Sequence, residues 1–387
     1  MMNKVILITF FSLLSIQCKS ETKKEKAIII TTLATNDHPT SGKNVELVFC
    51  LDATGSMSGL IGTAKEKIWD IVSELAQSND VESLKLGMIF YRDKRDAFVT
   101  KKIQLTTDLD EVYDKLLQIE ADGGGDTPES VNQALHEAVS DIQWSEQQKT
   151  YKTIFVVGDC PPHMDYQDDV KYTLSCKEAA RKGITINTIK LGKSCAEAIV
   201  HFRKMASCTN GEYLHLDQHA SDVVIATPYD DEIYEVSKSI DQSRVYYGTK
   251  AEQSVNYLKK EKSLEVYEKS SKTANSSRAS YKMSKAGKKS YGNKELITDY
   301  IDDKVEIEEI AEEELPSDFK GKSKQEIKVE LEKLKKERKE NEQKLRELSK
   351  KRKNYIDEQK KKLSKTEKKS FSEKVVEVLK KQSKEKE

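Results

Sequence analysis

The chain has 387 residues, of which 34% are charged and 36% are hydrophobic. Its net charge is zero, but residues 322–387 carry 25 Lys and Arg against 14 Asp and Glu, so the residues before them are acidic overall. A segment as polar as this tail cannot bury enough apolar surface to form its own core. The composition therefore excludes two full-sized hydrophobic domains and indicates one compact domain with extensions.

The first 17 residues have the pattern of an export signal. Asn3 and Lys4 form a short basic start, and residues 5–16 form an apolar run that falls short of the about 20 residues needed to cross a bilayer. Cys18 follows, and the chain then turns polar. This segment resembles the signal of bacterial lipoproteins, in which the cysteine becomes the acylated first residue. Because residues 15–17 depart from the usual motif, plain secretion and an uncleaved anchor remain as alternatives, and all three export the protein.

Residues 18–43 are polar and are expected to form a tether, whereas residues 44–225 alternate between apolar runs and segments with helical spacing. The expected strands cover residues 45–51, 84–91, 98–105, 153–157, 184–191 and 212–216. The expected helices cover residues 60–75, 109–119, 128–139, 168–182 and 196–206. This alternation predicts an α/β fold with a doubly wound, mostly parallel sheet and helices on both faces.

Beyond this domain the sequence is more polar. Residues 241–300 show no sustained period and residues 302–314 form an acidic run, so residues 226–320 are expected to form a polar and acidic linker of uncertain order. Residues 321–387 predict a basic, highly charged helical tail, which begins at a capping box formed by Ser323 and Glu326.

The leucines of this tail follow a heptad seam, but Arg338, Asn341 and Arg352 interrupt it, so a coiled coil is only weakly indicated. A solvated, extended helix is favoured over a nucleic-acid surface, because Glu residues are interleaved throughout and aromatic platforms are few. Export also argues against a nucleic-acid partner.

Three oxygen-bearing side chains follow the first expected strand. Asp52, Thr54 and Ser56 alternate along one turn. A carboxylate and two hydroxyls are hard ligands, which suit Mg²⁺, Mn²⁺ or Ca²⁺. In a doubly wound sheet, such a turn lies at the carboxyl end of a strand, where ligands bind. Taken alone, the same residues also fit an ordinary turn that caps the next helix.

Two further segments lead to the same edge of the predicted sheet. Residues 123–129 (GGGDTPE) form a glycine-rich loop before a helix, and Asp159 follows the strand at residues 153–157. Each has a simpler explanation, because glycines provide flexibility and an aspartate often ends a strand. The three segments together, in this order, indicate a divalent-metal site.

This combination of residues resembles the metal-ion-dependent adhesion site of von Willebrand type A domains. The DATGSM and GDCPPH segments are similar to bacterial members in particular, and the resemblance covers about residues 44–225. It implies a divalent ion, Mg²⁺ in the first place and Mn²⁺ or Ca²⁺ as alternatives. The ligands that it implies are Asp52, Thr54, Ser56, Thr127 and Asp159. Asp126 is an alternative to Thr127, because some members use an aspartate there. A protein partner that offers a carboxylate to the ion is also implied.

An enzyme is the less favoured interpretation. Haloacid-dehalogenase-like phosphatases also place a catalytic Asp after a first strand, but they use a second acid two residues further on, where this chain has Thr54. We therefore expect a non-catalytic, cell-envelope binding protein attached to a membrane by its lipid anchor. A structural envelope protein whose domain binds no metal is the other alternative.

Five cysteines remain if Cys18 is acylated. Cys50 lies inside the first strand and is expected to stay a free thiol. Cys160 and Cys195 follow the ends of successive strands, which would lie about 5 Å apart if the strands are neighbours, so we expect them to form a disulfide. Cys176 and Cys208 are then a possible second pair, and five free thiols are the alternative. His163, on the loop after Asp159, is interpreted as a surface residue, and a contact that supports the metal ligands is the less favoured alternative.

Overall fold

The computed structural model describes residues 42–77, 81–125, 127–147, 149–218, 222–363 and 370–385. The expected acylation site Cys18, the tether up to residue 41 and the alternative metal ligand Asp126 lie outside the described residues. Within the described residues, no helix is both long enough and apolar enough to cross a bilayer.

The central sheet has six strands in the order β3-β2-β1-β4-β5-β6. Only β3 runs antiparallel to its neighbour, β2. The bounds are Lys43–Asp52 for β1, Val81–Tyr91 for β2, Thr100–Thr106 for β3, Thr150–Gly158 for β4, Ile184–Leu191 for β5 and Tyr213–Leu216 for β6. The predicted α/β fold with a mostly parallel, doubly wound sheet is confirmed.

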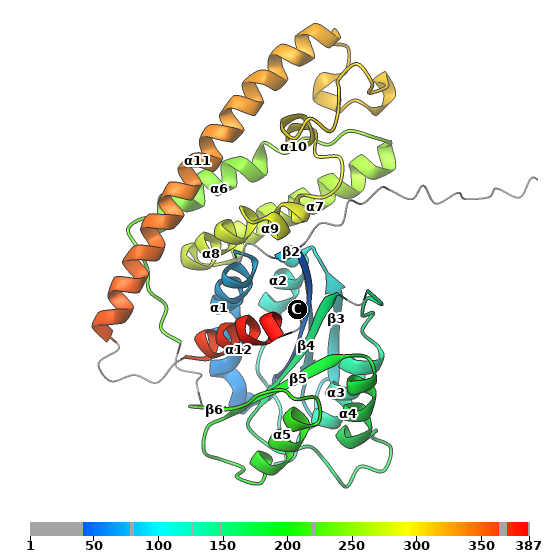
Figure 1. Cartoon of the computed structure of the whole chain (residues 1–387), viewed down its shortest axis with the longest axis vertical. Helices are drawn as coiled ribbons and strands as arrows, with labels where there is room; N and C mark the ends of the chain where they lie inside the picture. Colours follow the sequence, from blue (N-terminus) through cyan, green and yellow to red (C-terminus); the bar gives the residue numbers. More distant parts are fainter. Residues whose placement is uncertain are drawn as a thin grey trace, which may run out of the picture. The chain divides into compact units, whose positions relative to one another are not determined.

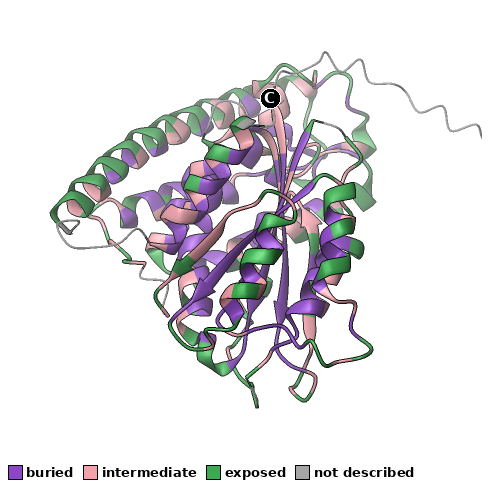
Figure 2. Cartoon of the chain, turned by 60° about the horizontal axis from the view of Figure 1, so that its bottom comes forward, coloured by how far each residue is buried: buried purple, intermediate pink, exposed green. Residues whose placement is uncertain are grey.

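Helices cover both faces of this sheet (Figure 1). Side chains of β1 alternate between the faces, with Leu47 and Phe49 in one core and Val48 and Cys50 in the other. Strands buried on both sides need apolar residues at nearly every position, which explains the continuous apolar run in the sequence. Figure 2 shows most of the sheet buried. One face packs against α3 (Val131–Ser140), α4 (Tyr172–Arg181) and α5 (Ala198–Ser207). The other packs against α1 (Ser58–Ala76), α2 (Leu109–Leu117) and α12 (Phe371–Glu385).

Helix α12 reaches this face from the far end of the sequence. Val375 and Leu379 are fully buried in the same core as α1. Near the end of the helix, the buried side chain of Gln382 accepts a hydrogen bond from Tyr151 Oη (2.6 Å) and donates one to Asn187 Oδ1 (2.8 Å). Since Tyr151 lies on β4 and Asn187 on β5, α12 is tied to the middle of the sheet by both apolar and polar contacts.

Residues 226–363, called here the helical region, connect β6 to α12. Helices α6 to α10 lie in residues 226–320, which the sequence predicted as a linker of uncertain order, and α11 lies in the predicted helical tail. Their bounds are Asp230–Gln242 for α6, Lys250–Lys269 for α7, Lys272–Lys282 for α8, Lys285–Lys288 for α9, Leu296–Ile301 for α10 and Lys324–Leu363 for α11. The predicted capping box is confirmed at the start of α11: Ser323 N donates to Glu326 Oε2 (2.8 Å), and Glu326 N donates to Ser323 Oγ (3.3 Å).

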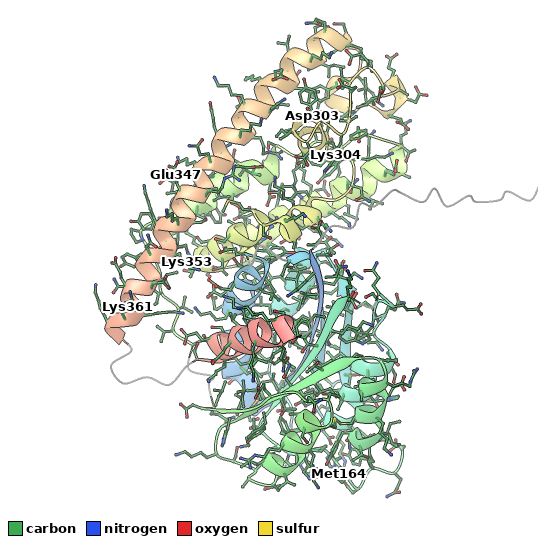
Figure 3. All side chains as sticks on the ribbon, viewed as in Figure 1. Met164, Asp303, Lys304, Glu347, Lys353 and Lys361 are labelled. Carbon is green, nitrogen blue, oxygen red and sulfur yellow. A yellow bond between two sulfur atoms is a disulfide. The ribbon has the colours of Figure 1, made fainter. Side chains whose placement is uncertain are left out.

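Helix α11 is solvated on one side only. Glu347 projects from its exposed side (Figure 3). The two arginines that interrupt the leucine seam are buried against the rest of the helical region. Arg338 Nη1 lies 3.3 Å from Glu295 Oε2, and Arg352 Nε donates to Asp230 Oδ1 (2.7 Å). The seam therefore faces this chain's own helices, and its charged positions are occupied by ion pairs.

A second group of buried ionised side chains joins the sheet to the helical region. Asp110 of α2 accepts hydrogen bonds from Nε (2.6 Å) and Nη2 (2.7 Å) of Arg278 on α8. Lys282 Nζ, also on α8, lies 2.9 Å from Asp110 Oδ2 and 2.7 Å from Asp241 Oδ2 on α6. Burial raises the pKa of Asp110, but attraction to Arg278 and Lys282 outweighs it, so the pKa lies well below its usual value. Burial also raises the pKa of Asp241, but attraction to Lys282 outweighs this effect, so the pKa is lowered to about 2.

Replacing Asp110 with Asn is expected to lower the free energy of unfolding by about 3–5 kcal/mol, because two cations would remain buried without their partner. Asp114→Asn is the matched control on the same helix. Asp114 pairs with Lys269 at a partly exposed site, where the loss is expected to be about 0–1 kcal/mol. Urea denaturation of both variants at pH 7 measures the difference.

The same substitution is expected to change the acid sensitivity of the fold. The pKa values of Asp110 and Asp241 are lower in the folded protein than the value of about 3.9 in an unfolded chain. Their ionised forms therefore stabilise the fold above about pH 4, and this stabilisation is lost as the pH falls through the folded-state values. Asp110→Asn should flatten the fall of the melting temperature below about pH 4. If the melting temperature of Asp110→Asn falls below about pH 4 as steeply as that of the wild type, this assignment is contradicted.

Candidate metal centre

The first loop of the candidate site begins where β1 ends. Asp52 is fully buried, and its Oδ1 accepts hydrogen bonds from Thr54 N (2.9 Å) and Thr54 Oγ1 (2.6 Å). Thr54 Oγ1 lies 3.4 Å from Ser56 Oγ. These hydrogen bonds leave Asp52 Oδ2 buried without a hydrogen-bond partner among the described residues. The turn thus collects a carboxylate and two hydroxyls, with one carboxylate oxygen uncommitted.

Parallel pairing brings the loop after β4 to the same place. Leu51 pairs with Val157 in the register of β1 and β4, so both strands end at one edge of the sheet. A Cβ atom on Gly158 would lie only 3.1 Å from Asp52 Oδ2 and 2.3 Å from Tyr91 Oη, so only glycine leaves room for the carboxylate here. Asp159, the next residue, is 3% exposed. Its Oδ1, like Asp52 Oδ2, is buried without a hydrogen-bond partner among the described residues.

The glycine-rich loop lies directly against the first loop. Gly55 N donates to Gly123 O (3.1 Å), and Asp122 N donates to Ala53 O (3.1 Å). Gly124 has a φ of +86°, and a Cβ atom there would lie 3.3 Å from Thr54 Cβ. This positive φ and close approach account for the glycine.

Thr127 lies further along the glycine-rich loop and is exposed. The structure therefore brings Asp52, Thr54, Ser56 and Asp159 together and carries Thr127 on the adjoining loop. Asp126 is not among the described residues.

Glu129 also lies at this rim, the edge of the sheet where β1 and β4 end, although the sequence did not single it out. Its side chain is 4% exposed, and Oε2 has no hydrogen-bond partner among the described residues. A Cβ atom on Gly124 would lie 3.7 Å from Glu129 Oε1 and 3.3 Å from Thr54 Cβ, so Glu129 and Thr54 both lie close to Gly124. The available signal was an acid two residues after Thr127 in the glycine-rich loop, but its orientation depends on the tertiary fold.

The carboxylates at this rim repel one another. Burial is the main cause that raises the pKa of Asp52 to about 7; repulsion from Asp159 adds to it, and hydrogen bonds from Thr54 oppose it. Burial, followed by repulsion from Asp52, raises the pKa of Glu129 to about 10. Buried acids of this kind without a nearby cation are unfavourable when ionised. A cation bound at this position would relieve the repulsion.

The chemistry of the donor set fits a small divalent cation. The two uncommitted oxygens belong to carboxylates, and the adjacent hydroxyls are neutral oxygen ligands, which Mg²⁺ accepts together with water. Within the described residues, no group of three or more His, Cys, Asp or Glu side chains is placed to hold a metal ion. The donors here are instead two acids, Asp52 and Asp159, with hydroxyls beside them, which is the composition of an open site.

Gln218 is a second site residue that no sequence pattern indicated. It follows β6, and its Nε2 donates to Asp159 Oδ2 (3.1 Å) and reaches Ser56 O (3.4 Å). This side chain links the loop after β4 to the first loop and restrains the orientation of the Asp159 carboxylate. Its distance from both loops in sequence explains why no pattern revealed it.

His163 is not a surface residue, so the interpretation from sequence is wrong. It is 3% exposed and stacks on Tyr166 with ring centroids 3.8 Å apart. Its Nδ1 lies 2.8 Å from Asp165 Oδ1, and its Nε2 lies 3.5 Å from Asp93 Oδ1. Its backbone N–H donates to Glu129 O (3.1 Å). His163 is buried because the loop after β4 folds back onto the start of α3.

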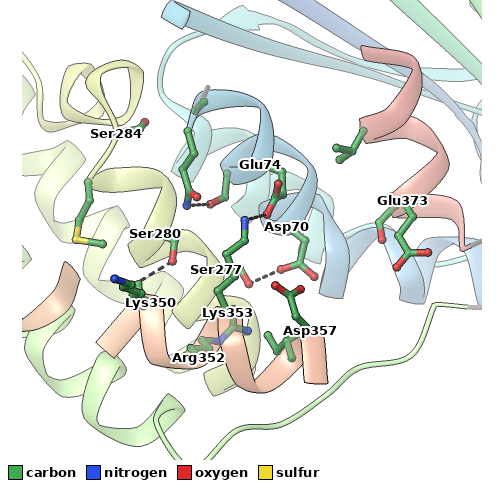
Figure 4. A pocket seen from close by; sticks show the side chains of 18 of the residues that line it. Asp70, Glu74, Ser277, Ser280, Ser284, Lys350, Arg352, Lys353, Asp357 and Glu373 are labelled. Carbon is green, nitrogen blue, oxygen red and sulfur yellow. Dashed lines mark hydrogen bonds and ion pairs between the residues drawn. The ribbon is translucent and has the colours of Figure 1, made fainter. Parts of the chain in front are cut away.

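A cavity of about 970 Å³ lies away from this rim, between α1, α8, α11 and α12 (Figure 4). Its acidic side chains include Asp70, which accepts a hydrogen bond from Ser277, and Glu74, which accepts one from Lys353 (3.0 Å). None of the candidate metal ligands lines it. The cavity therefore contributes nothing to the candidate metal centre.

The sequence profile of the von Willebrand factor A domain matches residues 46–228. A putative ariadne-like RING finger protein of Acanthamoeba polyphaga mimivirus is 28% identical over 119 residues. That match covers 31% of this chain but only 11% of the viral protein, so the likeness is confined to a small part of the relative.

Solved structures give weaker similarities. Proximal thread matrix protein 1 from the mussel byssus has a TM-score of 0.34 and 11% identity, over 46% of this chain and 43% of that chain. The SpRpn10 VWA domain has a TM-score of 0.35 and 14% identity, over 46% of this chain and 89% of that chain. At these values neither structure informs the function of this chain.

In the absence of a divalent cation, Asp52→Asn is expected to stabilise the protein. The amide oxygen can still accept the hydrogen bonds from Thr54, while one buried charge is removed from beside Asp159 and Glu129. Because the folded-state pKa of Asp52 is raised, its ionisation lowers stability as the pH rises towards about 7. In EDTA at pH 8, the melting temperature should therefore rise by about 1–2 °C, roughly the effect of 1 kcal/mol on a unit of this size. The gain should shrink at pH 5, and a lower melting temperature than that of the wild type at pH 8 would contradict the crowding of charges.

Proposed function

Because the chain contains a von Willebrand factor A domain over residues 46–228, we propose that it is a non-catalytic binding protein of the cell envelope. In this proposal a divalent cation, Mg²⁺ first and Mn²⁺ or Ca²⁺ as alternatives, is held by Asp52, Thr54, Ser56 and Asp159. Thr127 contributes from the glycine-rich loop. Domains of this family are in general interaction modules that bind proteins.

The observation that carries the proposal is the pair of uncommitted carboxylate oxygens. Asp52 Oδ2 and Asp159 Oδ1 are buried, come from adjacent parallel strands and have no hydrogen-bond partner among the described residues. A buried charged oxygen without a partner is costly, and a cation would satisfy both at once. The hydroxyls of Thr54 and Ser56 stand beside them to complete an oxygen-only ligand set.

The outer side of the site supports a protein partner. Ser56, the glycines at positions 123–125 and Thr127 are exposed, so a side chain from another molecule can approach the metal position from solvent. A carboxylate is the complementary group, because a divalent cation prefers charged oxygen ligands. The partner that we propose therefore offers an Asp or Glu side chain to the ion.

Export to the cell envelope is supported by the cysteines. Cys160 is joined to Cys195 and Cys176 to Cys208, and Cys50 is buried with a free thiol. Disulfides persist mainly in oxidising compartments outside the cytosol. Together with the apolar segment that ends at Cys18, they favour a lipoprotein attached to a membrane of the cell envelope.

A phosphatase is disfavoured by the residue that follows the first aspartate. A general acid would be needed where Thr54 stands, and the Thr54 hydroxyl instead donates a hydrogen bond to Asp52 Oδ1. A structural protein that binds no metal is the remaining alternative, and metal linkage distinguishes it from our proposal.

Mg²⁺ or Mn²⁺ is expected to stabilise the folded protein. A ligand that binds only the folded state adds about 2.7 kcal/mol at a concentration 100 times its Kd. Asp52→Asn and Asp159→Asn should each abolish this gain, because each removes a charged ligand. Thermal unfolding with metal and with EDTA measures it for all variants.

The matched control for metal linkage is Asp168→Asn. Asp168 lies on the loop after β4, as Asp159 does, but its side chain is 80% exposed and pairs with Lys94. This variant should keep the full metal-dependent gain. If the wild type melts at the same temperature with metal and with EDTA, the metal site is rejected and the structural alternative is favoured.

Acylation of Cys18 is expected to place the protein in the membrane fraction. Cys18→Ser removes the thioether position and should leave the protein soluble or unprocessed. Fractionation followed by mass spectrometry of the N-terminal peptide measures both outcomes. A wild-type protein that is soluble and retains a free Cys18 thiol would contradict the lipoprotein assignment.

A further inference from the structure

We infer that the Cys160–Cys195 disulfide is a positioning element of the metal centre, so that its reduction weakens cation binding. The inference rests on the proposed metal site and adds a redox control to it. Two disulfides join cysteines of the described residues, and of these two the Cys160–Cys195 bond is attached to the loop that carries a candidate ligand.

Cys160 directly follows Asp159 in the sequence, so any restraint on Cys160 also restrains the ligand. Its disulfide partner, Cys195, lies on the loop after β5, and the two Cα atoms are 5.1 Å apart. β4 and β5 are parallel neighbours, with Gly158 opposite Lys190. The bond therefore ties two adjacent loops together at the carboxyl edge of the sheet, next to the Asp159 carboxylate.

The loop after β5 is itself held firmly. Lys190 is fully buried, and its Nζ donates to Gly192 O (2.8 Å) and to Ser194 O. Cys195 adopts a left-handed backbone conformation with a φ of +47°, which is uncommon for a residue with a side chain. The disulfide thus joins the ligand-bearing loop to a segment with buried polar support.

Gln218 holds Asp159 from the other direction. Its Nε2 donates to Asp159 Oδ2 (3.1 Å), and a Cβ atom on Gly192 would overlap with its side chain. Asp159 is consequently restrained twice, by the disulfide from Cys160 to Cys195 on the loop after β5 and by the hydrogen bond from Gln218 on the segment after β6. Breaking the disulfide removes the covalent half of this restraint and leaves the hydrogen bond.

The redox step needs a dithiol reductant, which we name as its chemical partner. The dithiol gives two electrons and two protons to the disulfide, the S–S bond breaks, and Cys160 and Cys195 become thiols while the reductant becomes a disulfide. Both cysteines are partly exposed, so the bond is within reach of such a reductant. The freed loop must then be ordered when the cation binds, which lowers the affinity.

The second disulfide provides a matched control. Cys176 lies on α4, and Cys208 lies at the end of α5. The next residue, Thr209, accepts a hydrogen bond through its Oγ1 from Ile186 N, near the amino end of β5. This bond therefore joins helices on one face of the sheet and touches no candidate ligand. Its loss is expected to lower stability without changing the metal centre.

The test uses Mn²⁺ alone, titrated calorimetrically into the full chain. Oxidised wild type is compared with the double variants Cys160→Ser/Cys195→Ser and Cys176→Ser/Cys208→Ser, at a temperature where circular dichroism shows all three folded. The first double variant should bind Mn²⁺ at least about tenfold more weakly, the lower end of the effect of losing support around a ligand. The second should bind within about twofold of the wild type.

A second measurement on the wild type does not depend on any variant folding. If the disulfide strengthens metal binding, Mn²⁺ must favour the disulfide by the same factor. In a dithiol redox buffer, Mn²⁺ should therefore shift the reduction of Cys160–Cys195, followed by thiol alkylation and mass spectrometry, by about 30 mV for a tenfold coupling. The reduction of Cys176–Cys208 should not shift.

The outcomes separate the two proposals. Equal Mn²⁺ affinity in the wild type and the Cys160→Ser/Cys195→Ser variant, or equal shifts of both disulfides, would overturn the inference and leave the metal site intact. Absence of Mn²⁺ binding to the oxidised wild type would reject the metal site itself. Equal weakening in both double variants would show that the effect is general loss of stability and would also overturn the inference.

Discussion

The sheet is apolar on both faces, and the face that carries α1 and α2 is closed by α12. Val375 and Leu379 of this helix complete the core, and Gln382 anchors it to β4 and β5. Because α12 follows β6 by more than one hundred residues, the helical region has to leave the sheet and return to it. The placement of every helix from α6 to α11 is therefore subject to the requirement that α12 packs against β4 and β5.

Buried charges join the helical region to α2, beside apolar contacts such as that of Tyr281 with Trp69 of α1. Asp110 on α2 meets Arg278 and Lys282 on α8, and Asp241 on α6 shares Lys282. Buried ion pairs add little net stability relative to apolar packing, but the loss of one partner is severe, because the other charge stays buried. These contacts therefore specify where α8 lies against α2 more than they add to the overall stability.

At the rim of the sheet, in contrast, buried acids lie together without ion pairs to other described residues. Asp52, Glu129 and Asp159 are buried acids whose mutual repulsion and burial disfavour ionisation. Hydrogen bonds from Thr54 and Gln218 hold two of them in place, but no basic side chain bonds to them among the described residues. The fold tolerates this arrangement because the two strand ends are fixed by the sheet, and a bound cation would convert the repulsion into stability in the function that we propose.

The sequence by itself determined the fold class and the rim of the site. Apolar runs and helical spacing are local signals, and parallel strands bring Asp52 and Asp159 to one edge whatever the detailed packing. Tertiary structure alone decided which residues surround them. Glu129 and Gln218 come from separate segments, and their roles depend on where side chains point after folding. The helices of residues 226–320 also escaped prediction, because α7 and α8 together bury more polar than apolar side chains, and α6 carries only three apolar residues at helical spacing, Ile233, Val236 and Ile240. Whether a charged residue can be buried depends on its partner, and the two become neighbours only when the chain folds.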